Sequence, residues 1–426
     1  MREPDNQSPL PVAARVLAWW SRRGSVVLLW AVVFMAVAAA GWLTYETWRL
    51  LWQPSPADPP RPGLENLGAR DLWERYVETR ALFSGKAVCA VIGSASYPPA
   101  SMTMLWPILG WSSFATARWL WALITVGSLI WLARVVLRDS GATTSAERRL
   151  LALLPVAMYA TGAATGNGQL SVPVVACLIA SLPILLRDDR GMPAALAVLC
   201  FVGALVKPSV AAPFFWMVLF RPKRFLWAIA ILATYAGLTV APTLAQTVSA
   251  VELSREFLSR SEVIATWGAA HHGHANMHSW FGAMGLSSWN TAGSLVVLGL
   301  LGAWTWRHRR ADPWLLMSAA SFAARFWTYH GWYDDVLLLI PMMALFRLAK
   351  QSASEAQKVW AGSLLAAMVC STAAPGGLYL LPSPFDSAYG GMQLAIWITA
   401  CVYLLRATNR PPVVSGRLSA SPAQNG

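Results

Sequence analysis

Long apolar runs are the sequence feature that most constrains the fold of this chain. A helix rises about 1.5 Å per residue and the bilayer hydrocarbon is about 30 Å thick, so a run of about 18 apolar residues predicts a membrane-spanning helix. Residues 26–44 form such a run, and similar apolar runs recur to the C-terminus. Only 12% of the 426 residues are charged, against roughly a quarter in soluble domains. The sequence therefore predicts an all-α, polytopic membrane protein.

The order of apolar runs and basic clusters predicts about twelve spans with both termini in the cytoplasm. Lys and Arg gather in clusters at 187–190, 221–224, 307–310 and 347–350, which the positive-inside rule places in the cytoplasm. Because these residues form no single basic face, the net charge of +13 does not indicate nucleic-acid binding. The expected spans are 24–46, 113–137, 149–165, 170–186, 193–206, 209–220, 225–245, 290–306, 313–329, 335–349, 358–380 and 390–406.

This pattern divides the chain into three parts. Residues 1–23 form a cytoplasmic N-terminus, 24–406 form the transmembrane domain, and 407–426 form a cytoplasmic tail that is rich in Pro, Ser and Ala and expected to be disordered. Two long polar loops within the transmembrane domain, 47–111 and 246–289, then lie on the extracytoplasmic side.

The first outer loop contains an amphipathic segment, 70–83, whose apolar residues share one stripe and suit a helix on the membrane surface. Asp71 lies on this segment, where a carboxylate can act as the general base for an acceptor hydroxyl. The alternative is a solvated surface acid, and the residue pattern alone favours that alternative. Asn167 and Gln169 lie in a turn between two expected spans, where they either cap the turn or bind sugar hydroxyls.

Two cations interrupt apolar runs on the outer side. A charge at membrane depth is costly and by default suggests a function, so Lys207, which precedes Pro208, is a candidate phosphate-binding residue. Arg325 lies about one helical turn from the outer end of its expected span, at the depth of lipid headgroups. For each of them the alternative is a side chain that extends along the apolar surface to the membrane interface.

Histidines are concentrated in the second outer loop, at His271, His272, His274 and His278. Neutral imidazole is a common metal ligand, but this spacing matches no metal-binding signature. We therefore expect no cofactor and no metal centre, and leave the use of a divalent cation open. One of these histidines could instead bind phosphate or assist proton transfer, and the remaining interpretation is a polar loop that happens to be rich in histidine.

A second polar cluster consists of His330, Asp334 and Asp335. The paired acids either bind a cation or cap the N-terminus of the next span, and we favour capping. Apolar runs and basic residues alone define the expected topology, and the polar candidates nevertheless all fall on its outer side. Their common side favours a single site there.

The order of these polar residues resembles glycosyltransferase family 87, a bacterial branch of the GT-C superfamily that includes polyprenol-phosphate-mannose-dependent mannosyltransferases. The similarity covers most of 24–406 and depends on short motifs. The residues that carry it are Asp71 with Tyr76, Gly85, Tyr97-Pro98-Pro99, Gly168-Gln169, Lys207-Pro208, Asn276 to Ser279, and His330.

The resemblance implies a GT-C-like hexosyltransferase in the bacterial cytoplasmic (inner) membrane, with its active site on the extracytoplasmic face. Such an enzyme transfers a sugar, here expected to be mannose, from a polyprenyl-phosphate donor to a lipid or glycan acceptor with inversion. The resemblance implies that Asp71 is the general base, and the residues expected to bind the donor phosphate or other parts of the substrates are Lys207, Arg325, His278, His330, Gln169, Asn167 and Tyr76.

Two departures from the family pattern leave roles open. The family often has a tyrosine four residues after the aspartate, whereas Tyr76 follows Asp71 by five, so Glu74 is an alternative base. The family pattern after Asn276 is Gln-Ser, whereas this chain has Met277, His278 and Ser279. Which histidine has a functional role is therefore left open.

A transporter or flippase for a lipid-linked saccharide is the alternative function. A transporter predicts broken helices, charges at mid-depth in the membrane and two similar halves. The sequence shows long outer loops and no internal repeat, which favours the enzyme. Membrane lipids are partners under both hypotheses.

Overall fold

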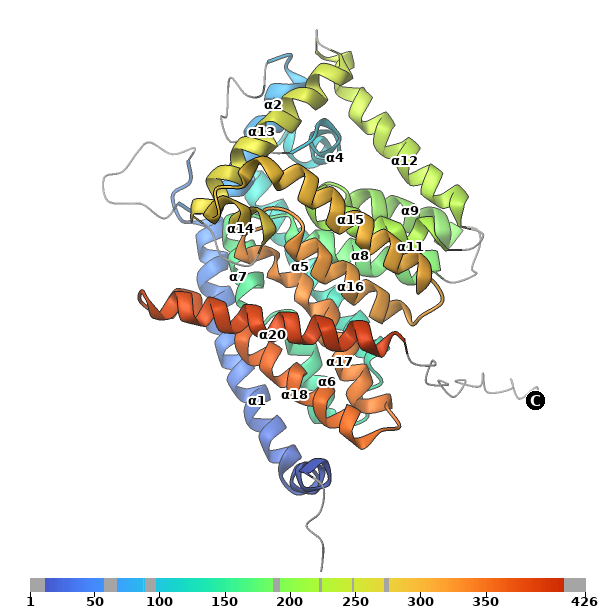
Figure 1. Ribbon diagram of the computed structural model, residues 1–426. Coiled ribbons are helices and arrows are strands. Elements are labelled where there is room, and N and C mark those ends of the chain that lie inside the picture. The colour runs from blue at the N-terminus through green and yellow to red at the C-terminus, as the bar shows by residue number, and fades with distance from the viewer. Residues whose placement is uncertain are drawn as a thin grey trace, which may run out of the picture.

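The computed structural model describes residues 12–56, 67–86, 88, 97–186, 192–221, 224–246, 249–271 and 276–409. Their regular secondary structure is helical, apart from one isolated β-bridge between Met158 and Ala373. The expected all-α fold is thus confirmed for the described residues. The longest helix, α1 (Val12–Leu51), runs along one edge of the molecule, and α20 (Phe385–Ala407) crosses its front (Figure 1).

The first half of the chain contains mostly short helices after α1. The expected amphipathic segment 70–83 is one of them and forms a helix with the bounds Arg70–Phe83. The helices are α2 (Arg70–Phe83), α4 (Pro99–Leu109), α5 (Phe114–Ser140), α6 (Ser145–Leu153), α7 (Tyr159–Asn167), α8 (Ser171–Leu186), α9 (Met192–Ala204), α10 (Pro208–Ala211), η1 (Ala212–Phe214) and α11 (Phe215–Leu219).

The second half opens with an apolar helix and continues with a helix in the polar loop 246–289. The helices are α12 (Phe225–Val240), η2 (Ala241–Leu244), α13 (Ala250–His271), α14 (Met277–Ala283), η3 (Ser287–Trp289), α15 (Asn290–Arg307), α16 (Pro313–Phe326), η4 (Trp332–Leu338), α17 (Leu339–Gln351), α18 (Glu355–Thr372), α19 (Gly377–Leu380) and α20. In Figure 1, α13 lies at the top of the molecule with α2 and α4.

Four stretches of the described residues are long and apolar enough to cross a bilayer, namely Arg22–Leu51, Phe114–Ser140, Phe225–Leu244 and Phe385–Ala407. Two bent helix pairs raise this number to six if each pair counts as one broken span. The chain thus has the helices of a membrane protein, whereas the expectation of about twelve spans is not confirmed. Helices such as α16 and α17, with 14 and 13 residues, are about 20 Å long and shorter than the hydrocarbon thickness.

The first bent pair is α7 and α8, which meet at 116°. Gly168 ends α7 with φ of 70°, a left-handed conformation that favours glycine and stops a helix. The single span expected at 149–165 is wrong, because α6 ends at Leu153 and α7 begins only at Tyr159. The helix is therefore interrupted between Leu153 and Tyr159, inside the apolar run that was expected to be one span.

The second bent pair is Pro193–Ala204 with Pro208–Leu219, which meet at 119°. Pro208 has no N–H and disfavours helical backbone in the residue before it. Lys207 accordingly has φ of −123° and ψ of 82°, outside the helical region. The two short runs expected to be separate spans thus form the two arms of one broken helix, and Lys207 lies at the break.

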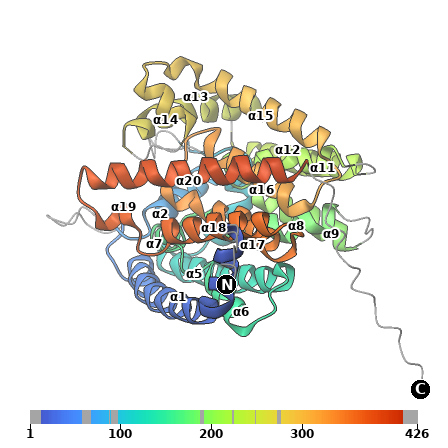
Figure 2. The ribbon, with the colours of Figure 1, turned by 60° about the horizontal axis from the view of Figure 1, so that its bottom comes forward.

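The buried core lies where α8, α9, α16, α17 and η4 meet, and α8 and α9 lie side by side in both ribbon views (Figures 1 and 2). Every residue from Leu339 to Phe346 is buried by the rest of the protein. A helix that is apolar on all sides is buried, but apolarity does not say whether lipid or protein covers it. Several runs that read as spans are therefore covered largely by protein.

We expect Gly168→Ala to destabilise the fold, because a Cβ there lies 2.5 Å from the Cβ of Leu72 and the positive φ strains any L side chain. The expected loss is about 2–4 kcal/mol, measured as a lower melting temperature in detergent micelles. Gly127→Ala is the matched control, because a Cβ at Gly127 meets nothing within 4 Å and Ala favours a helix interior. Equal melting temperatures for Gly168→Ala and the wild type would contradict this account.

Candidate functional site

Asp71 lies in the first turn of α2, and the backbone before it is anchored on two sides. The N–H of Gly68 donates to the carbonyl of Pro54 at 2.9 Å, and the N–H of Ala69 donates to the carbonyl of Gly166 at 2.9 Å. Ala69 has φ of 53°, which is uncommon for a residue other than glycine. These bonds connect the start of α2 to the end of α1 and to the α7–α8 turn.

The carboxylate of Asp71 is half-buried and accepts a hydrogen bond from the side chain of Gln169. Burial raises the pKa of Asp71 above its ordinary value, and the nearby charge of Arg75 is the largest opposing influence. A carboxylate with a raised pKa is a stronger base in its ionised form. Asp71 is therefore not the freely solvated surface acid of the alternative interpretation.

Lys207 connects Gln169 to a buried carboxylate. Its Nζ donates to Oε1 of Gln169 at 3.3 Å, to Oγ of Ser171 at 3.2 Å and to Oδ1 of Asp334 at 2.5 Å. A lysine ammonium has three N–H donors, so these bonds use its full capacity. Its side chain is 8% exposed, so the interpretation that Lys207 extends to the membrane interface is wrong.

Asp334 and Asp335 are both buried and are held by partners from α7, α8, α16, the helix break at Lys207 and the loop before η4. Asp334 accepts hydrogen bonds from Lys207, from Ser171 of α8 and from Nδ1 of His330, the last at 2.9 Å. The residue that precedes η4 is Gly331, which has no side chain to cap the helix. Both acids lie in the first turn of η4, but no side-chain cap hydrogen bond is described there or at the start of α17, so their interpretation as helix caps is not confirmed. The carboxylates instead neutralise cations, because buried charges need partners.

Arg325 forms the second ion pair of the site. Its Nε donates to Asp335, and the same carboxylate accepts the phenol hydrogen of Tyr159 from α7. The guanidinium carbon lies 5.6 Å from the centre of the Trp397 ring, and the side chain is 4% exposed. The interpretation that Arg325 extends to the interface is therefore wrong as well.

His330 is 1% exposed and presents one ring nitrogen without a hydrogen-bond partner among the described residues. Its Nδ1 donates to Asp334, which leaves Nε2 as the unpartnered atom. Burial lowers the pKa of His330, although Asp334 acts in the opposite direction. In the neutral tautomer that this bond selects, Nε2 is an acceptor that can bind or deprotonate a hydroxyl.

His278 joins α14 to α15 and to the end of α16. Its Nε2 lies 2.9 Å from Oγ of Ser294, whose hydroxyl donates to the carbonyl of Trp327 at 2.7 Å. Burial lowers the pKa of His278 to about 4, so the imidazole is neutral at pH 7 and brings no positive charge to a phosphate. Of the other histidines in this loop, His271 is described only as the end of α13, and 272 and 274 lie outside the described residues.

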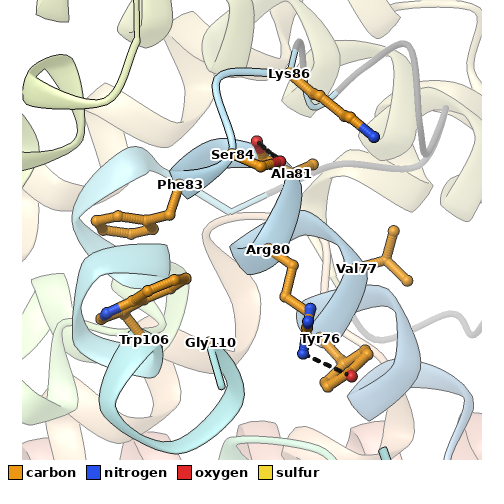
Figure 3. Close-up of a pocket in the computed structure, with 9 residues that line it drawn as sticks. All are labelled: Tyr76, Val77, Arg80, Ala81, Phe83, Ser84, Lys86, Trp106 and Gly110. Atoms are coloured by element: carbon orange, nitrogen blue, oxygen red, sulfur yellow. Dashed lines mark hydrogen bonds between the residues drawn. The ribbon is translucent and has the colours of Figure 1, made fainter. Parts of the chain in front are cut away.

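Tyr76 and Asn167 have other hydrogen-bond partners. Oδ1 of Asn167 accepts a hydrogen bond from Nη2 of Arg49 at 3.1 Å. The hydroxyl of Tyr76 donates to the carbonyl of Ser112 at 3.1 Å. Tyr76 lines a pocket of about 480 Å³ between α2 and α4 (Figure 3).

Glu74, the alternative base, is engaged in ion pairs. Its carboxylate lies 3.2 Å from Nη2 of Arg75, and the same nitrogen donates to Oε1 of Glu78 at 2.7 Å. Burial raises the pKa of Glu78 to about 8 against the opposing charge of Arg75. The Arg75 guanidinium also lies 4.1 Å from the centre of the Tyr97 ring. This acid–arginine cluster is a contact set that the sequence interpretation missed, although the spacing of Arg75 and Glu78 could have indicated it.

Two further members of the site were not predicted from the sequence, Ser171 and Tyr159. Both are small or amphipathic residues at helix starts, and neither differs in sequence context from an ordinary core residue. Among the residues that the structure describes, no group of three or more histidine, cysteine or acidic side chains is placed to hold a metal ion.

We expect Arg325→Met to destabilise the protein by about 3–5 kcal/mol, because it leaves the buried Asp335 charge unpaired. The double variant Arg325→Met with Asp335→Asn should regain much of this loss, since Asn keeps an acceptor for Tyr159. Thermal unfolding of the purified variants in detergent measures both effects. A double variant that is no more stable than the single one would show that the pair is not the reason for the loss.

Comparison with known proteins gives one match. The model of glycosyltransferase family 87 matches residues 96–328, which is more than half of the chain. No curated protein and no solved structure matches. The matched range includes Gln169, Lys207 and Arg325, whereas Asp71 and the Asp334–Asp335 pair lie outside it. On the strength of this match, the chain belongs to glycosyltransferase family 87.

Proposed function

We propose that this membrane glycosyltransferase transfers a sugar, mannose in the first instance, from a polyprenyl-phosphate donor to a lipid or glycan acceptor. The transfer takes place on the extracytoplasmic face of the bacterial cytoplasmic membrane and inverts the anomeric centre. Asp71 is the general base. The observation that carries the proposal is the half-buried Asp71 carboxylate, with its raised pKa, joined through Gln169 to the buried Lys207–Asp334 pair.

The position of Asp71 supports a lipid-linked substrate. The stretch Arg22–Leu51 is a candidate span, and Gly68, three residues before Asp71, is hydrogen-bonded to Pro54, three residues after Leu51. The start of α2 is therefore close to one end of a membrane-spanning helix. A phosphate on a polyprenyl chain lies at the same depth, since the chain is in the hydrocarbon and the phosphate is at the interface.

The proposed step requires one base and one leaving group. Asp71 accepts the proton of the acceptor hydroxyl while the hydroxyl oxygen attacks the anomeric carbon from the face opposite the phosphate. The bond between the anomeric carbon and the phosphate oxygen breaks, and its electron pair leaves with the polyprenyl phosphate. The configuration at the anomeric carbon inverts, and no covalent intermediate with the enzyme forms.

The contacts of Lys207 change its proposed role. Its three donors are already occupied and its charge is balanced by Asp334, so we propose that it positions Gln169, which in turn orients Asp71. Arg325 likewise holds Asp335 and Tyr159 in place. His330, with its unpartnered Nε2, is the member of this network that we propose accepts a hydrogen bond from a substrate hydroxyl.

The transporter hypothesis gains support from the two broken helix pairs and from the buried charges beside them. Broken helices with charged residues at the break are typical of secondary transporters. The same features also serve an enzyme, because irregular backbone at membrane depth is tolerated where it is buried in protein or lines a cavity. The family match favours glycosyl transfer.

We expect Asp71→Asn to lower transfer about 10²–10⁴-fold, since the amide cannot accept the acceptor proton. The measurement is transfer of radiolabelled mannose from polyprenyl-phosphate-mannose by purified protein in lipid vesicles. Glu74→Gln is the matched control on the same helix and should retain most of the activity. Both variants need melting temperatures close to that of the wild type.

Four results would change the proposal. Full transfer by Asp71→Asn would remove Asp71 as the base, and a selective loss in Glu74→Gln would assign that role to Glu74. Transfer from a nucleotide sugar without the lipid carrier would show that the donor class is wrong. Movement of a labelled lipid-linked saccharide across vesicles without any transfer product would support the transporter instead.

We expect kcat/KM to fall as the pH is lowered through the folded-state pKa of Asp71, because only the ionised carboxylate accepts a proton. This acidic limb lies above the ordinary pKa of aspartate, since burial raises the pKa. Arg70→Gln should move the limb to higher pH, because Arg70 lowers the pKa of Asp71. The exposed Arg149 of α6 provides the control Arg149→Gln, which should leave the profile unchanged. If the acidic limb of the kcat/KM profile stays at the same pH in Arg70→Gln, the limb reports the titration of a group other than Asp71.

A further inference from the structure

The pocket between α2 and α4 is lined by three aromatic side chains and two cations. Figure 3 shows Lys86 toward one end, Arg80 beside Tyr76 toward the other, and the rings of Phe83 and Trp106 on one side. The last two rings stack with centres 4.4 Å apart. We propose that this pocket binds the phosphate of an anionic glycerophospholipid of the surrounding bilayer.

The two cations of the pocket have no acidic partner among the described residues. Both are exposed, and neither forms an ion pair with a described carboxylate. Nη1 of Arg80 is fixed by its bonds to the hydroxyl of Tyr76 at 2.9 Å and to the carbonyl of Ser112 at 3.2 Å. A guanidinium has five N–H donors, so Arg80 is held in position while further donors stay available for an anion.

The pocket lies at the depth where lipid phosphates lie. Gly110 lines it, and Ser112, which binds Arg80, is two residues before the candidate span Phe114–Ser140. This span has 27 residues and is about 40 Å long, so its ends extend beyond the hydrocarbon into the headgroup region.

Exposed tryptophans mark the same boundary. Trp111 is 78% exposed beside the pocket, and Trp119 and Trp52 are 52% and 60% exposed with ring centres 5.7 Å apart. Tryptophan is enriched at membrane–water interfaces, where the ring lies at the level of the headgroups. The phosphate of a neighbouring lipid can thus reach these cations without leaving the bilayer.

This pocket is distinct from the site around Asp71. Arg80 follows Asp71 by nine residues, which is about 14 Å along a helix and half a turn around it. A phosphate bound by Arg80 is therefore on the opposite face of α2 and is not the reacting group. Such a lipid would instead hold the helix that carries Asp71 against the bilayer.

A lipid-binding experiment tests the assignment independently of the transfer reaction. Native mass spectrometry of the delipidated protein in detergent, titrated with phosphatidylglycerol or phosphatidylcholine, should show tighter binding of phosphatidylglycerol that weakens with salt. Lys86→Gln should lower this affinity about fivefold and Arg80→Gln with Lys86→Gln about 25-fold, as expected for charges at a membrane surface. Arg149→Gln, which removes an exposed charge far along the chain, should leave it unchanged.

Lys86→Gln alone keeps the test informative if Arg80→Gln fails to fold, because no described hydrogen bond depends on the Lys86 ammonium. Unchanged phosphatidylglycerol binding in a folded Lys86→Gln protein would overturn the proposal. Equal thermal stabilisation of the wild type by inorganic phosphate would assign the pocket to a soluble anion. Displacement of phosphatidylglycerol by polyprenyl phosphate would assign it to a prenyl lipid, which also overturns the proposal.

Discussion

The two buried ion pairs, Lys207 with Asp334 and Arg325 with Asp335, are the interactions on which the arrangement of the central helices depends. Each of the four charges is almost fully removed from solvent, and a buried charge without a partner is far more costly than a buried pair. Adjacent positions 334 and 335 therefore must face two different cations at the same time. This requirement fixes η4 between the helix break at Lys207 and the end of α16.

The ion pairs in turn require helices that stop inside the protein. An unbroken helix across 204–208 would leave Lys207 on a regular helical surface, whereas Pro208 and the break before it release this residue from the helix. Gly168 ends α7 in the same way, and the turn that begins there brings Gln169 and Ser171 within reach of the lysine. The freed backbone and the charged side chains are tolerated because protein surrounds them.

Asp71 enters this arrangement from a separate helix. The start of α2 is held by backbone hydrogen bonds to Pro54 and Gly166, and Gln169 joins its carboxylate to Lys207. The Asp71 carboxylate, the helix break and the ion pair are thus connected by one chain of hydrogen bonds. The arrangement places a half-buried acid beside a charge-balanced network of buried hydrogen bonds, and such a fully bonded network is rigid.

The sequence by itself determined the helical fold, the membrane character, the bounds of α2 and the family, because apolar periodicity, charge and motif order are local properties. It also pointed to Asp71, Gln169, Lys207, Arg325 and His330, which the structure brings together around the adjacent carboxylates of Asp334 and Asp335. The sequence did not indicate whether lipid or protein covers each apolar run, because apolar residues suit lipid and a protein core equally. Only the tertiary structure decided that Lys207 and Arg325 are paired with Asp334 and Asp335, that Ser171 and Tyr159 belong to the site, and that Tyr76 does not contact Asp71. Those contacts join residues far apart in the chain, and partner choice depends on the desolvation of charges, which exists only once the helices have packed.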